Sequence, residues 1–177
     1  PVSIDCCTTM QYRILGHSQL TVSSIGMGCV TFGREIDTQS SLPIMDHAFE
    51  HGITLLDTAE AYAQGASESV VGEWLSSRNR RDQIVLATKV NGTLTRERIV
   101  SSTEASLKRL QTDRIDLLQT HVWDDSTPLE ETLEAMTTLV QQGKVRYIGC
   151  SNYDASQLVA ALALSDKSEL TRLTSVQ

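Results

Sequence analysis

The chain has 177 residues, a net charge of −7, and only ten glycines and three prolines. Its length suits one domain of ordinary size, and its 40% of hydrophobic residues excludes disordered and collagen-like classes. An acidic chain without a basic run is a poor candidate for binding nucleic acid. No apolar run reaches the ~20 residues of a membrane helix, so we expect no membrane insertion.

The first ten residues, PVSIDCCTTM, show no secretory signal and are left unassigned. The four cysteines are Cys6, Cys7, Cys29 and Cys150, and none forms a C-x-x-C pair or a Cys/His cluster with zinc spacing. We therefore expect reduced thiols, no metal site and a cytoplasmic location.

After this segment, the sequence predicts a small hairpin followed by a strand–helix repeat. The hairpin comprises residues 12–15 and 20–22, separated by Gly-His-Ser-Gln. The later apolar runs are continuous rather than alternating, which is typical of parallel strands buried on both faces. They begin 28 to 31 residues apart, about one strand–helix unit. These runs are Ile25–Val30, Ile53–Leu56, Ile84–Ala87, Ile115–Leu118, Val145–Ile148 and Leu173–Val176.

The segments between these strands have helical patterns. The clearest helix begins near Thr127, which can cap it, with Pro128 at the first position and Glu130 completing a capping box. Gly143 can end this helix in the left-handed conformation. The other helices are expected around Ile44–Phe49, Ser67–Ser77, Thr95–Leu110 and Ala155–Leu164.

Strictly alternating strands and helices predict a parallel sheet, either a closed barrel or a doubly wound open sheet. A dinucleotide-binding open sheet carries G-x-G-x-x-G after its first strand. Residues 26–33, GMGCVTFG, lack the third glycine at the required place. This favours an α/β fold of the (β/α)₈ TIM-barrel type.

Polar side chains follow three successive predicted strands. Asp57, Lys89 and His121 come at or just after their carboxyl ends, and Tyr62 lies in the loop after Asp57. In a barrel these ends carry the catalytic groups. Each residue alone has an ordinary structural explanation, such as capping a helix, contacting solvent or packing. Together, in consecutive units, they predict a site.

The chemistry of this set is acid catalysis. A phenol is a weak acid, and a neighbouring ammonium favours its ionised form. We assign Tyr62 as general acid, Lys89 as its electrostatic partner, Asp57 as the anchor of Lys89, and His121 as the group that orients a carbonyl substrate. No serine or cysteine nucleophile with a base is evident, so a cofactor hydride is the natural nucleophile.

At these residues the sequence resembles the aldo-keto reductases. The matching stretches, in the family's order, are residues 26–33, Asp57-Thr-Ala-Glu-Ala-Tyr62, residues 87–90, residues 116–121 and Ile148-Gly-Cys-Ser-Asn-Tyr153. The resemblance implies a barrel that reduces aldehydes and ketones with NADPH, NADH not being excluded. It also implies that Asp57, Tyr62, Lys89 and His121 form the catalytic tetrad. The residues that it assigns to the cofactor are Cys29, Val30, Asp57, Ser151, Asn152 and Gln177.

The resemblance covers residues 11–177, with six of the eight strand–helix units. Two further units would need about 60 residues at the observed period. We therefore expect an incomplete barrel domain. Three interpretations stay open: a carbonyl-reducing enzyme acting on a small molecule, a regulatory subunit of the potassium-channel β-subunit type, or an inactive truncated fragment.

Overall fold

A two-stranded antiparallel hairpin opens the part of the chain that the computed structural model describes, residues 10–177. Strand β1 (Tyr12–Ile14) pairs with β2 (Thr21–Ser23), which confirms the predicted hairpin. The expectations for residues 1–9, including Cys6 and Cys7, lie outside the described residues.

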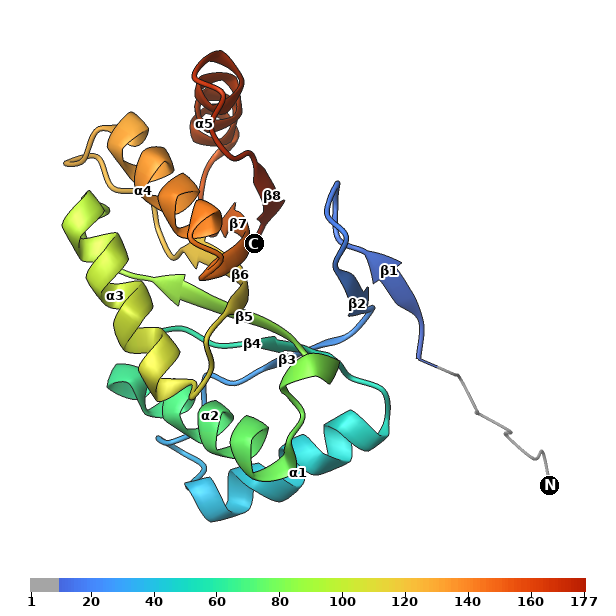
Figure 1. The fold of residues 1–177 in the computed structure, drawn as a ribbon. Coiled ribbons are helices and arrows are strands. Elements are labelled where there is room, and N and C mark those ends of the chain that lie inside the picture. The colour runs from blue at the N-terminus through green and yellow to red at the C-terminus, as the bar shows by residue number, and fades with distance from the viewer. Residues whose placement is uncertain (1–9) are drawn as a thin grey trace.

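Six parallel strands follow the hairpin and form one curved sheet (Figure 1). Their order in the sheet is their order in the sequence, so each strand pairs with the strand of the next unit. This arrangement confirms the predicted α/β fold, with six strands forming half of a barrel wall. The strands are β3 (Gly26–Gly28), β4 (Leu55–Asp57), β5 (Val85–Val90), β6 (Ile115–Thr120), β7 (Val145–Cys150) and β8 (Leu173–Val176).

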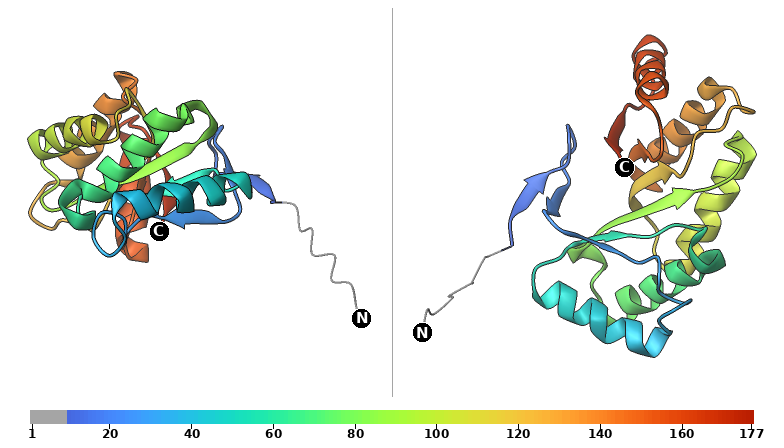
Figure 2. Two further views of the ribbon diagram at one scale, coloured as in Figure 1. Left: turned by 90° about the horizontal axis from the view of Figure 1, so that it is seen from below. Right: turned by 180° about the vertical axis from the view of Figure 1, so that it is seen from behind.

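The helices lie on the outer face of this sheet, with the hairpin on the opposite side (Figure 2). Every predicted helix is present. They are α1 (Thr38–Glu50), α2 (Ala66–Arg78), α3 (Arg96–Arg109), α4 (Leu129–Gln141) and α5 (Ala155–Lys167), with short 3₁₀ turns η1 (Tyr62–Gly65) and η2 (Arg81–Gln83).

The start of α4 differs from its prediction. Pro128 occupies the N-cap position, and no side chain caps the helix. The Thr127 hydroxyl instead donates to Asp124 Oδ2 at 2.6 Å, so it is not available to the helix amides. The expected capping box is therefore wrong, although Gly143 does follow the helix with a φ of 72°.

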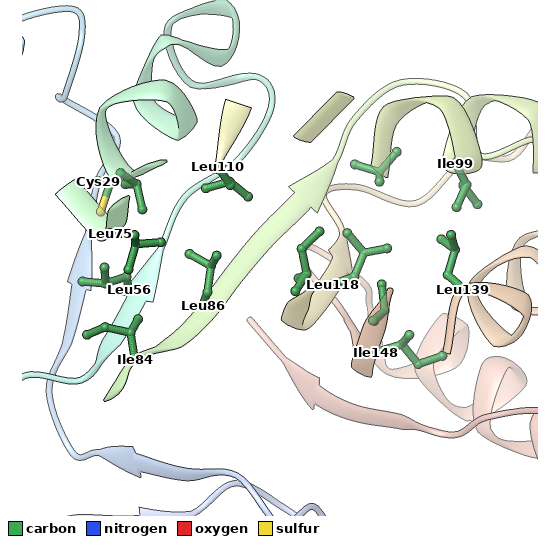
Figure 3. Packing of buried hydrophobic residues seen from close by; sticks show 14 of the residues in the cluster. Cys29, Leu56, Leu75, Ile84, Leu86, Ile99, Leu110, Leu118, Leu139 and Ile148 are labelled. Atoms are coloured by element: carbon green, nitrogen blue, oxygen red, sulfur yellow. The ribbon is translucent and has the colours of Figure 1, made fainter. Parts of the chain in front are cut away.

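The core fills the space between the strands and the outer helices (Figure 3). Leu86, Leu118 and Ile148, from three neighbouring strands, are fully buried. Ile99 of α3 and Leu139 of α4 are buried in the same cluster. Burial of each such side chain contributes about 1.5–3 kcal/mol, so this layer fixes the central strands on which the site is built.

The hairpin closes the amino-terminal end of the strands. Leu20 and Val22 are buried against Val85, at the start of β5. The backbone N–H of Gln19 donates to Tyr147 Oη at 3.0 Å. The hairpin loop also approaches β8 closely, because a Cβ on Gly16 would lie 2.7 Å from the Thr174 carbonyl oxygen. Apolar residues thus cover the end of the sheet opposite the candidate site.

Two negative findings apply to residues 10–177. No helix there is long and apolar enough to span a membrane. No three His, Cys, Asp or Glu side chains in that part gather into a group that could hold a metal ion. Cys29 and Cys150 are both buried free thiols.

Candidate active site

The carboxyl ends of three neighbouring strands bring the four predicted catalytic side chains together. Asp57 is the last residue of β4, and Lys89 is the next-to-last residue of β5. His121 follows β6 directly, and Tyr62 begins η1 in the loop after β4. The strands are parallel and paired in register, Asp57 with Ala87 and Lys89 with Gln119, so all four groups lie at one end of the sheet.

Lys89 is the buried centre of this group. It is only 1% exposed, and its Nζ lies 2.7 and 2.8 Å from the two carboxylate oxygens of Asp57. The same Nζ donates to the Thr58 carbonyl oxygen at 3.0 Å. A buried ammonium is tolerated only when it is paired and hydrogen-bonded, and Asp57 with Thr58 meets that need.

The Tyr62 hydroxyl is the remaining neighbour of this ammonium. Lys89 Nζ donates to Tyr62 Oη at 3.4 Å, the longest of its four contacts. Since the phenol oxygen accepts this bond, its own proton stays free for another acceptor. The Tyr62 ring meets His121 edge to face, with 5.7 Å between ring centroids and an interplanar angle of 82°.

The surroundings of His121 disfavour the charged form of its imidazole. Partial burial, together with the charge of Lys89, lowers the pKa of His121 below its ordinary value. A neutral imidazole can orient a ligand through hydrogen bonds, but it is a poor proton donor. This favours Tyr62 over His121 as the acid.

The residues that the resemblance assigns to the cofactor lie beside this group. Ser151 is buried, and Asn152 Nδ2 donates to the Ser151 hydroxyl at 3.0 Å and to the His121 carbonyl oxygen at 2.9 Å. The Gln177 side-chain amide donates to Asp57 Oδ2 at 3.3 Å. Asp57 and Gln177 also line a cavity of about 180 Å³ inside the curved sheet. Three polar side chains therefore adjoin the tetrad from β7 and β8.

Cys29 and Val30 differ in what they expose. Cys29 is fully buried, and this burial raises the pKa of its thiol to about 12, so it is an inert core residue. Its carbonyl oxygen accepts from the Ser67 hydroxyl at 2.7 Å. Val30 is 40% exposed. Of these two residues, only Val30 has a side chain that is exposed to solvent.

Glu60, which lies between Asp57 and Tyr62, is a residue that the sequence pattern alone does not single out. Its carboxylate accepts from the Asn91 N–H at 2.6 Å, from Arg98 Nη2 at 2.6 Å and from the Ser102 hydroxyl. The available signal was the spacing of Arg98 and Ser102, which places two donors on one face of a helix. Their acceptor could not be identified without the packing of α3 beside the β4 loop.

Comparison with known proteins shows the family to which the chain is similar. The profile of the Aldo/keto reductase family matches residues 24–177. The chain is 36% identical to Protein tas of Escherichia coli, over 95% of this chain and 59% of that protein. It is 38% identical to the probable voltage-gated potassium channel subunit beta of Arabidopsis thaliana, over 91% of this chain and 52% of that protein.

A solved structure gives the same result for the fold. The holo form of aldo-keto reductase AKR11C1 from Bacillus halodurans superposes with a TM-score of 0.80 at 36% identity, over 94% of this chain and 56% of that one. The chain therefore spans less than two thirds of the length of each of these relatives.

Proposed function

Because the chain belongs to the aldo/keto reductase family, we propose that it reduces an aldehyde or ketone to an alcohol, with Tyr62 as the general acid. The observation that carries this proposal is the position of Lys89. Its buried ammonium donates to Asp57 on one side and to the Tyr62 oxygen on the other. An ion pair that only stabilised the fold would not require the Tyr62 phenol beside it. General acid catalysis does require a proton donor at this place.

The role of each side chain follows from its contacts. Tyr62 donates its free proton to the carbonyl oxygen of the substrate. Lys89 stabilises the phenolate that remains, and Asp57 keeps Lys89 charged and in place. His121, whose ring lies against Tyr62, hydrogen-bonds the carbonyl oxygen and sets its direction.

We propose NADPH as the cofactor, with NADH as the alternative, and its chemistry when bound is to supply the hydride to the carbonyl carbon. The donor set fits the nicotinamide end. A carboxamide has one acceptor and one donor group, and the hydroxyl of Ser151 and the amides of Asn152 and Gln177 offer both kinds of partner. Asp57 and Val30 complete the residues that we assign to holding it.

Steady-state reduction of an aldehyde by wild type, Tyr62→Phe and His121→Gln tests the proposal. Tyr62→Phe keeps the ring and removes only the hydroxyl, so we expect turnover to fall by about 10²–10⁴ with cofactor affinity nearly unchanged. If Tyr62→Phe keeps more than about a tenth of wild-type turnover while His121→Gln loses nearly all of it, the two roles are reversed.

The similarity to the Arabidopsis protein supports a second candidate, a regulatory channel subunit. The tetrad does not decide between the two, because a subunit derived from a reductase can keep it. Co-purification with a voltage-gated potassium channel, by wild type and by Tyr62→Phe alike, is the expected result of this second function. Aldehyde turnover without channel binding would leave only the first.

A further inference from the structure

Glu60 carries a mostly buried carboxylate on the loop that contains Tyr62. Its side chain is 11% exposed, and its three donors come from the loop after β5 and from α3. Resting on the function proposed above, we propose that Glu60 is a positioning residue that holds the Tyr62 hydroxyl beside Lys89.

The first step of the argument is that Glu60 joins the Tyr62 loop to the segment containing Lys89. Beyond Asp57, where β4 ends, the Thr58 N–H donates to the Ala87 carbonyl and the Glu60 N–H donates to the Lys89 carbonyl at 3.2 Å. The Glu60 carboxylate then accepts the Asn91 N–H. Glu60 thus binds this segment at two points, through its N–H at Lys89 itself and through its carboxylate at Asn91, two residues further on.

The second step is that this loop needs to be held. Ala63 and Gln64, which follow Tyr62 directly, have φ values of 50° and 55°. This left-handed region is sparsely populated by residues other than glycine, and it persists only when surrounding contacts impose it. On the amino-terminal side of Tyr62, Thr58 and Glu60 both bind β5, and Glu60 also binds α3 through Arg98 and Ser102.

The third step separates positioning from simple stabilisation. Asp46 makes comparable contacts elsewhere, accepting from the Arg78 guanidinium and from Trp74 Nε1 between α1 and α2. Both carboxylates join two elements through an arginine and a neutral donor. Only Glu60 lies on the Tyr62 loop, so Asp46→Asn is the matched control for Glu60→Gln.

The experiment follows the position of the Tyr62 ring through the NMR signals of the neighbouring His121 ring. The ¹H NMR signals of the His121 ring, assigned by their loss in His121→Gln, feel the Tyr62 ring current across 5.7 Å. Spectra are recorded at about pH 8, where the imidazole is neutral. We expect Glu60→Gln to move these signals at least halfway to their positions in Tyr62→Ala, and Asp46→Asn to leave them in place.

The kinetic arm uses the same variants. We expect Glu60→Gln to lower kcat about 10- to 100-fold, the effect of a misplacement of about 1 Å, with KM for the cofactor unchanged. If wild type itself reduces no aldehyde, the proposed function fails, and the NMR arm still decides whether Glu60 positions Tyr62.

Two results would overturn the proposal: unmoved His121 signals in a folded Glu60→Gln protein, or equal movement in Asp46→Asn. Circular dichroism establishes folding for each variant. If Glu60→Gln does not fold, Ser102→Ala replaces it, since it removes one donor and keeps the carboxylate. The signals should then move in the same direction by a smaller amount, and signals that stay in place contradict the proposal.

Discussion

The middle of the sheet and its two edges are built differently. Every residue of β5 and β6 is buried, whereas no residue of β3 or β8 is. The central strands also contain charged residues, each of them paired. Lys89 binds Asp57, and the buried Asp116 lies 2.8 Å from Arg81 and 3.0 Å from Arg146.

This difference in burial matches the difference between the proposed catalytic and cofactor-binding positions. Lys89, which we assign to stabilising the phenolate, and His121, which we assign to orienting the substrate, lie in or next to the most buried strands, where packing restricts their movement. Gln177, assigned to the cofactor, follows an edge strand and is exposed. The two proposed catalytic positions are thus central in the sheet, whereas this proposed cofactor position is peripheral.

The largest effect is expected from removing a charged group from the centre of the sheet. Lys89→Met removes the ammonium that stabilises the Tyr62 phenolate, so turnover should fall by about 10²–10⁴, as for loss of the acid itself. The Tyr62→Phe/Lys89→Met double variant should cost far less than the sum, because both changes disable one proton-transfer unit. Lys144→Met, which removes an exposed partner of Glu104, is the control and should keep wild-type turnover. Additive losses in the double variant would contradict the coupling.

A second prediction compares how much the centre and the edge of the sheet contribute to the free energy of unfolding. Leu118→Ala leaves a cavity between β6 and the outer helices and should lower the free energy of unfolding by about 2–5 kcal/mol. Val176→Ala in β8 removes a side chain that is 54% exposed and should cost less than about 0.5 kcal/mol. Urea unfolding measures both. Similar losses for the two variants would mean that the edge is as tightly packed as the centre.

The smallest expected effect is the pH dependence due to His121. Its pKa is lowered in the folded state, so below its ordinary value near 6.5 the unfolded chain binds more protons than the folded one. Stability should therefore fall as the pH drops from 6.5 through the lowered pKa. We expect acidification from about pH 7.5 to about pH 5 to destabilise wild type more than His121→Gln in urea unfolding. An equal loss in both proteins would contradict the lowered pKa.

The sequence predicts features that depend on local pattern and misses those that depend on packing between units. The continuous apolar runs identified all six parallel strands, and the polar residues after them identified Asp57, Lys89 and His121. The cap of α4 was mispredicted because Asp124, three residues earlier, takes the Thr127 hydroxyl. The left-handed Ala63 and Gln64 carry no turn signal, because their conformation is imposed by the loop's neighbours.

The hairpin has a consequence for the order in which the chain assembles. Its contacts are with segments far away in sequence: Ser23 accepts from Thr54 N–H, Gln19 donates to Tyr147, and Gly16 lies against Thr174. On the ribosome the hairpin emerges well before Tyr147 and Thr174, and domains form as their parts appear. Contacts of such long sequence separation form slowly, because the loop entropy must be lost first. We therefore expect the hairpin to be synthesised before the strands that it contacts and to dock only after they have formed.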